Sequence, residues 1–144
     1  MAVRLHDLVP ILQIAIGPMI LVSGVSLLLL SMTNRLGRVI DRSRALSTEL
    51  RSGPAQRDRL VKQLEILATR ARLVRQAITL AIVSVLSAAV LIITLFVAAV
   101  FALEVGVLVV ALFVSCMVAL IGGLVAFLRD INLSLAALAL ELGP

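Results

Sequence analysis

Three long stretches without a charged residue constrain this chain more than any other feature: residues 8–32, 77–103 and 105–128. A helix rises about 1.5 Å per residue, so roughly 20 residues cross the hydrocarbon core of a bilayer, and each stretch is long enough. The first is longer than the apolar part of a typical signal peptide and no small-residue cleavage site follows it, so we interpret it as a retained span. With 62% apolar residues and a mean hydropathy of +1.20, the chain has the composition of a membrane protein.

The positions of the Lys and Arg residues predict how the spans are oriented. Of the 13 such residues, all except Arg4 and Arg129 lie between the first and second spans. Because basic segments stay on the cytoplasmic side, we expect this segment in the cytoplasm, the amino terminus outside and the carboxyl end inside. Only Glu104 separates the second span from the third, which predicts a tight turn outside. The pI of about 11.3 then reflects topology and attraction to anionic lipid headgroups, and we expect no nucleic-acid partner.

Residues 33–76 are predicted to form an antiparallel helical hairpin in the cytoplasm. Apolar residues recur at helical spacing on both sides of a break at Ser52-Gly53-Pro54. The first stripe contains Leu36, Val39 or Ile40, Leu46 and Leu50, and the second contains Leu60, Leu64, Leu67, Ala71 and Val74. No Pro separates either arm from the neighbouring span, so each span is expected to continue into its arm as one helix.

The last residues, 129–144, are expected to form a short amphipathic helix. Leucines alternate here with small or polar residues, which is also a strand pattern, but a lone strand near lipid would leave its backbone groups unpaired. Leu128, Ile131, Leu135, Leu138 and Leu142 fall on one side of a helix. This tail helix is predicted to lie at the cytoplasmic membrane interface or against a neighbouring subunit.

These elements define the fold class as an all-α membrane protein with three transmembrane helices, a hairpin between the first and second, and a C-terminal amphipathic helix. The 144 residues form one membrane domain. A single chain of this size is too small to enclose a large cavity, so we expect a homo-oligomer.

Few residues of the chain are suited to chemistry. Cys116 lies inside the third span, where a lone thiol is typically a small packing residue, and His6 precedes the first span, where an interfacial role is typical. No His, Cys or acidic cluster has the spacing of a metal site, and there is no glycine-rich phosphate loop. The spans carry none of the charges that ion-coupled carriers use. We therefore expect neither an enzyme nor a metal or cofactor site.

The first span carries small residues at a regular interval, which we call the small strip. Gly17, Gly24 and Ser31 recur every seven residues, with Gln13 near the same side. Two interpretations remain open: a neighbouring helix packs closely on this strip, or copies of the first span surround a narrow pore, with Gln13 and Ser31 offering hydrogen bonds to ions. Small residues also recur in the other spans, which favours packing in general. They are Ala77, Ala81, Ser84 and Ala88 in the second span and Ala111, Ser115, Ala119, Gly122 and Ala126 in the third.

Basic residues continue the small strip toward the hairpin. If the helix is continuous, the position seven residues after Ser31 is Arg38. Arg38 then lies on the opposite side of the helix from the hairpin stripe. In a ring of subunits, Arg38 and Arg42, with Arg35 or Asp41, would surround a cytoplasmic mouth. In a single subunit these residues would meet lipid phosphates.

Two functions of different classes fit these patterns. The leading hypothesis is a homo-oligomeric pore or ion channel lined by the first span. The alternative is a non-conducting scaffold or regulatory subunit whose basic hairpin binds a protein partner or anionic lipid. The sequence identifies no particular protein partner.

Three stretches of the chain resemble a known family: GPMILVSGVSLLLLSMTNRLGRVIDR, LEILATRARLVRQAI and FLRDINLSLAAL. They are similar to the characteristic stretches of an uncharacterised family of small bacterial membrane proteins, catalogued as a domain of unknown function. The resemblance extends over nearly the whole chain. It implies a bacterial inner-membrane protein with three spans and a cytoplasmic helical segment, and it implies no activity for any residue.

Overall fold

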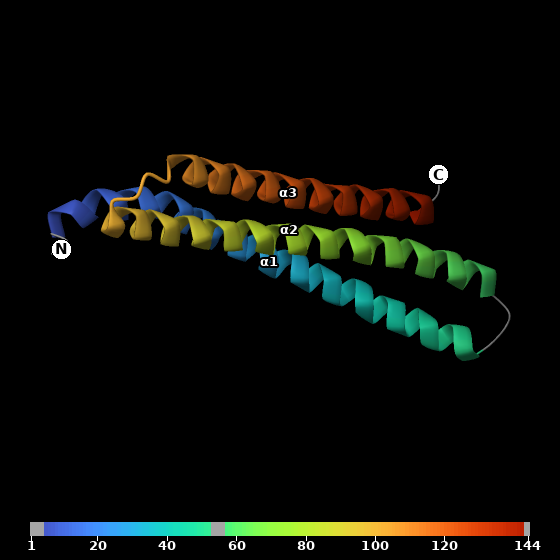
Figure 1. The fold of residues 1–144 in the computed structure, drawn as a ribbon. Coiled ribbons are helices and arrows are strands. Elements are labelled where there is room, and N and C mark those ends of the chain that lie inside the picture. Colours follow the sequence, from blue (N-terminus) through green and yellow to red (C-terminus); the bar gives the residue numbers. More distant parts are fainter. Residues whose placement is uncertain (1–4, 53–56, 143–144) are drawn as a thin grey trace. The chain divides into compact units, whose positions relative to one another are not determined.

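The computed structural model describes residues 5–52 and 57–142, and all secondary structure in these ranges is α-helical. Helix α1 spans Leu5–Ser52, α2 spans Arg57–Phe101 and α3 spans Gly106–Leu142 (Figure 1). Each of the three helices contains a segment long and apolar enough to cross a membrane. The prediction of an all-helical protein with three candidate membrane spans is therefore confirmed.

The helices extend beyond the charge-free stretches. Helix α1 continues through the basic residues to Ser52, and α2 already begins at Arg57. Residues 129–142 are the last part of α3, which corrects the expectation of a separate tail helix. The physical reason is that no Gly or Pro interrupts residues 124–142, so nothing ends the helix there.

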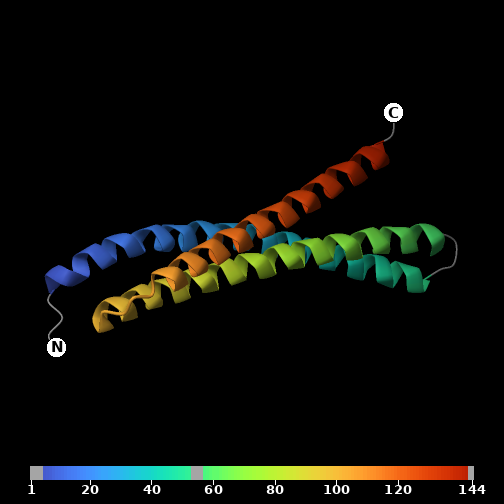
Figure 2. The ribbon, with the colours of Figure 1, turned by 45° about the horizontal axis from the view of Figure 1, so that its top comes forward.

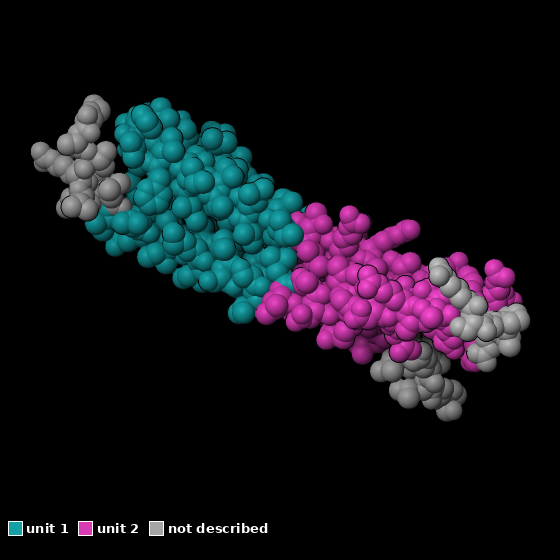
Figure 3. All heavy atoms as spheres, turned by 90° about the horizontal axis from the view of Figure 1, so that it is seen from below, with its two compact units in different colours: residues 1–29, 80–121 teal, residues 30–79, 122–144 magenta. Residues whose placement is uncertain are grey.

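Backbone contacts divide the chain into two compact units, which Figure 3 colours separately. Unit 1 comprises residues 1–29 and 80–121. Among its described residues, the buried side chains are Ala15 and Val25 on α1, Ala81, Ser84, Ala88 and Leu91 on α2, and Cys116 and Ala119 on α3. Most of these side chains are small, and small residues let helix backbones approach closely, which is how helices associate where lipid surrounds them.

Unit 2 comprises residues 30–79 and 122–144, and it contains two apolar clusters. In the first, which we call the arm cluster, Val39 and Leu46 of α1 are buried with Leu60 and Leu67 of α2, and Leu50, Leu64 and Ala71 pack against them. In the second, the boundary cluster, Met32, Val74 and Ala77 are buried among Leu36, Ile78, Ala126 and Phe127. Figures 1 and 2 both show the arms of α1 and α2 side by side in this unit. The sequence left Val39 or Ile40 open for the first stripe; Val39 is 6% exposed and Ile40 is 40% exposed, so Val39 is the buried one.

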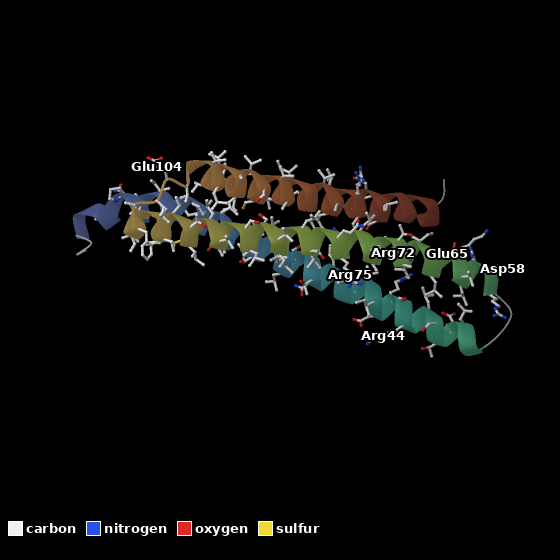
Figure 4. All side chains as sticks on the ribbon, in the orientation of Figure 1. Arg44, Asp58, Glu65, Arg72, Arg75 and Glu104 are labelled. Atoms are coloured by element: carbon white, nitrogen blue, oxygen red, sulfur yellow. The ribbon has the colours of Figure 1, made fainter. Side chains whose placement is uncertain are left out.

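A tight turn at Ala102 joins α2 to α3. Helix α2 ends at Phe101, and Ala102 has a φ of 51°, in the left-handed region. The Leu103 N–H donates to the Ala98 carbonyl at 2.9 Å, which is the characteristic hydrogen bond of a Schellman cap. Glu104 is exposed in this turn (Figure 4). An Ala side chain therefore occupies the position where helix ends most often have Gly.

Candidate functional site

A buried carboxylate in unit 2 contacts two arginines from two other helices. Asp130 of α3 is 0% exposed. The Nε atom of Arg70 on α2 lies 3.4 Å from its Oδ1 atom, and the Nε atom of Arg35 on α1 lies 3.6 Å from its Oδ2 atom. The Arg70 contact is a hydrogen bond donated by Nε–H, whereas the Arg35 contact is an ion pair. We call Arg35, Arg70 and Asp130 the charge cluster.

The position of the charge cluster follows from the ends of the charge-free stretches. Arg35 comes shortly after Met32, Asp130 follows the third stretch by two positions, and Arg70 precedes Ala77. Met32 and Ala77 belong to the boundary cluster, so apolar packing brings the three helices together directly beside these charges. The Arg35 guanidinium also lies over the Phe127 ring, with Cζ 5.4 Å from the ring centre, which is a cation–π distance.

The charge cluster is not fully satisfied by the residues that the structure describes. Asp130 Oδ2 is buried and has no hydrogen-bond partner among them. The two arginine side chains are 24% and 21% exposed, so part of each remains at the surface. Both contact Asp130 through Nε, and within the described ranges no hydrogen bond involves their terminal Nη groups. Two positive charges thus face one negative charge.

The chemistry available to this site is electrostatic. Removing a carboxylate from water is costly, and it is tolerated where opposite charges compensate, as the two arginines do here. Because its two oxygens face two different helices, Asp130 ties α3 to both arms in unit 2. Among the described residues, no group of His, Cys, Asp or Glu is arranged to hold a metal ion. The site can therefore fix helices and attract anions.

The structure leaves the small strip of α1 uncovered. All of its members are exposed, namely Gln13, Gly17, Gly24 and Ser31. Apart from its own helical turn, a Cβ atom added at Gly17 or at Gly24 would meet no atom within 4 Å. Gly17 borders a small apolar pocket together with Ala88 of α2 and Phe113 of α3, but neither glycine makes a close helix contact within the described chain.

The small residues of α2 behave in the opposite way. The buried residues of this helix include the whole series Ala77, Ala81, Ser84 and Ala88. This series on α2 thus serves close packing inside the chain. The small strip of α1 needs another explanation.

The residues expected at a cytoplasmic mouth lie in two different environments. Arg38, Asp41 and Arg42 are exposed on the arm of α1. Arg35 faces Asp130 instead, which separates it from the other three. Further exposed basic side chains follow along the arms, including Arg44, Arg72 and Arg75 (Figure 4).

Cys116 has the environment of a packing residue. It is a free, buried cysteine, and its thiol donates to the Ser84 carbonyl at 3.2 Å. Its Sγ atom also lies 3.4 Å from Ser84 Oγ. Both residues belong to unit 1, where they join α3 to α2. The side chain of His6 lies outside the described residues.

Sequence reasoning missed Arg70 and Asp130, which belong to the charge cluster. One signal was present: Asp130 is an acidic residue directly beside the end of an apolar span, where a charge needs a partner. The partners lie far away in the sequence, since Arg70 and Asp130 are 60 residues apart. The periodicity of one helix cannot identify such a pair.

Comparison with known proteins places the chain in a family. No curated protein and no solved structure matches the chain. A family pattern does match, over residues 15–140, and its description is a protein of unknown function, DUF2721. These residues include most of the first apolar stretch, all of the second and third, and the whole charge cluster. The chain therefore belongs to the DUF2721 family.

Proposed function

We propose that this chain forms a homo-oligomeric channel in a membrane, lined by the face of α1 that carries the small strip. One observation carries the proposal: the regularly spaced small series of α2 is buried within the chain, whereas the small strip of α1 is exposed. A Gly inside a helix costs about 1 kcal/mol relative to Ala. Two such residues on an uncovered face are explained if neighbouring copies of α1 approach there.

Polar groups on α1 support the same conclusion. The Gln13 side chain is exposed on a helix segment that is apolar enough to span a membrane. Pro18 lies inside α1 and has no N–H, so the Ile14 carbonyl lacks its usual donor. Unpaired amide groups cost several kcal/mol in hydrocarbon, and an aqueous pore or another copy of α1 would satisfy them.

The helical phase of these residues suits a gated pore. At about 100° per residue, the four members of the small strip lie within roughly 40° of one another. Ile20 and Leu27 project on the same side and are 67% and 72% exposed. In a ring of α1 helices, Gln13 and Ser31 would form polar zones on either side of an apolar constriction at Ile20 and Leu27. Constrictions of this kind gate channels by excluding water.

The orientation in this proposal follows from the basic residues. The arms of α1 and α2 form a hairpin in the bacterial cytoplasm, the amino terminus and Glu104 lie outside, and the end of α3 returns to the inner face of the membrane. Lys and Arg residues between the first two spans support this orientation. Arg38, seven residues after Ser31, then lies at the cytoplasmic mouth.

Reconstitution of the purified chain in liposomes tests the proposal. We expect ion flux from wild type and its loss in Gly24→Leu, because a bulky side chain on the small strip blocks the approach of neighbouring copies. The matched control is Ser26→Leu, which adds a similar side chain to another exposed position of α1, about 200° away. Equal flux from both variants would remove the small strip from the channel.

A second function is favoured by the exposed basic residues of the arms. Arg42, Arg44, Arg72 and Arg75 are all exposed. A scaffold or regulatory subunit would use this surface to bind an acidic protein or anionic lipid, without any current. Absence of flux together with retained oligomers would favour this function over the channel.

A further inference from the structure

We propose that the charge cluster binds a phosphate group between the guanidinium groups of Arg35 and Arg70. This site does not depend on conduction or on contacts between copies of α1. It takes its shape from unit 2 alone. Its donors are two particular arginines, and the buried Asp130 carboxylate contacts both of them.

Arg35 and Arg70 both have N–H groups left over to donate to a phosphate. A guanidinium has five N–H groups, one on Nε and four on the two Nη atoms. Arg35 and Arg70 both direct Nε to Asp130, and in the described part of the chain their Nη groups make no hydrogen bond. Planar Nη groups pair with phosphate oxygens in a fork geometry, which makes Arg well suited to phosphate.

The charge cluster has a net positive charge that Asp130 does not balance. Charge-assisted N–H···O contacts are typically about 2.7–2.9 Å long, whereas those of Asp130 are 3.4 and 3.6 Å. The carboxylate has an unpaired Oδ2 atom and balances only one of two positive charges. A second anion on the outer side of the guanidinium groups would neutralise the remaining charge and reduce their repulsion.

Both arginines can be reached from outside the protein. The arginine side chains are 24% and 21% exposed, so a ligand can reach them while Asp130 stays buried. The cluster lies at the ends of the charge-free stretches, where the phosphates of lipid headgroups lie. A groove of about 290 Å³ also adjoins Arg70, lined by Glu65, Ile66, Thr69 and Leu133, and it is open to a small soluble compound. The phosphate can therefore come from a lipid headgroup or from solution.

Thermal unfolding of the full chain in a neutral detergent tests the site, because a ligand that binds the folded state raises the unfolding midpoint with its concentration. Loss of helix is followed by circular dichroism during titration with phosphatidylglycerol, with soluble glycerol phosphate, and with diacylglycerol, which has no phosphate. We expect stabilisation by at least one phosphate compound and none by diacylglycerol. Stabilisation by phosphatidylglycerol alone identifies a lipid site, and stabilisation by glycerol phosphate identifies a site for soluble phosphate compounds. No stabilisation by either phosphate compound overturns the proposal.

Two variants of the charge cluster should change the affinity in opposite directions. Arg70→Gln removes half of the donors, and we expect about ten-fold weaker binding. Asp130→Asn removes the competing carboxylate and leaves both arginines, so we expect tighter binding although the folded state is less stable. If the charge cluster served only to hold the helices together, the two variants would not change the phosphate affinity in opposite directions.

Further variants distinguish a change in phosphate affinity from a failure to fold. Arg72→Gln removes an exposed charge two residues from Arg70, and we expect the wild-type affinity. The helix content of each variant before heating shows whether it is folded. If Arg70→Gln does not fold, Arg35→Lys replaces it, because Lys keeps the positive charge but lacks the planar guanidinium. Equal affinities for Arg70→Gln and Arg72→Gln, or weaker binding by Asp130→Asn, would overturn the proposal.

Discussion

The carboxylate of Asp130 shows how one residue can determine the arrangement of several helices. Its side chain is fully buried, and the compensation comes from Arg35 and Arg70. Removing one partner of a buried ion pair destabilises a protein by more than the intact pair stabilises it, because the remaining charge is still buried but no longer compensated. The stability of unit 2 should therefore depend on each arginine.

Arg70→Met tests this dependence. We expect the free energy of unfolding to fall by about 2–3 kcal/mol, because the Asp130 carboxylate loses the one hydrogen bond that it accepts from the described residues. Denaturant unfolding in detergent measures the change. Arg72→Met removes an exposed charge from the same helix and should change stability by about 0.5 kcal/mol or less. Similar losses in the two variants would show that Asp130 has no special dependence on Arg70.

Ala102 offers a second test, in which we expect a substitution to raise the stability of the protein. Its φ of 51° is unfavourable for an L-residue by roughly 1 kcal/mol, and Gly lacks the Cβ that causes this cost. Ala102→Gly should raise the free energy of unfolding by up to about 1 kcal/mol. Ala99→Gly, at an exposed position inside α2, should lower it by about 1 kcal/mol. If both variants are destabilised, the turn does not have the left-handed geometry.

Single residues also show what sequence reasoning cannot supply. The charge-free stretches and the glycine spacing were readable from local patterns, and so was the packing character of Cys116. The pairing of Arg35 with Asp130 was not, because it depends on where α3 packs against α1. Arg35 was instead grouped with Arg38 and Arg42, since helical phase alone does not distinguish a long side chain that bends toward a neighbour.

At the scale of elements, the arms of α1 and α2 depend on the arm cluster. Leu67 of α2 is 7% exposed in it, whereas its neighbour Ile66 is 49% exposed. Leu67→Asp should destabilise the arms by about 3 kcal/mol or more, because the carboxylate must be buried without an assigned partner. Limited proteolysis of the arms measures the effect.

The matched control is Ile66→Asp, which places the same charge on the exposed side of α2. It should leave protease resistance close to that of wild type. Equal resistance of Leu67→Asp and wild type would contradict the observed packing of the arms.

Helical periodicity predicted several buried residues of the arm cluster for a physical reason. An apolar stripe at helical spacing has one buried face, so Leu46, Leu60 and Leu67 were identifiable before any coordinates. The choice between Val39 and Ile40 needed the actual phase of α1. The continuation of α3 to Leu142 could have been predicted from the sequence, because no Gly or Pro interrupts residues 124–142.

At the scale of the whole molecule, the proposed orientation can be tested by labelling. Ser47→Cys places a thiol at an exposed position on an arm, and Glu104→Cys places one in the turn between α2 and α3. In intact cells, we expect an impermeant thiol reagent to label Glu104→Cys and to leave Ser47→Cys unlabelled. Disrupted cells should label both, which controls for reactivity. The reverse pattern in intact cells would invert the orientation.

The channel itself is tested most directly by the reversal potential of the reconstituted protein across a salt gradient. Positive charge from several copies of Arg38 at the mouth should favour anions, so Arg38→Glu should shift the reversal potential toward cation selectivity. Arg57→Glu is the control, because this exposed residue begins α2, at the far end of the arm. The arm of α1 from Arg38 to Ser52 is roughly 20 Å long, and charge is screened within about 10 Å at moderate salt. A protein-dependent current with a shift in Arg38→Glu alone is the expected result. No current from wild type, or one reversal potential shared by all three proteins, would contradict a channel lined by α1.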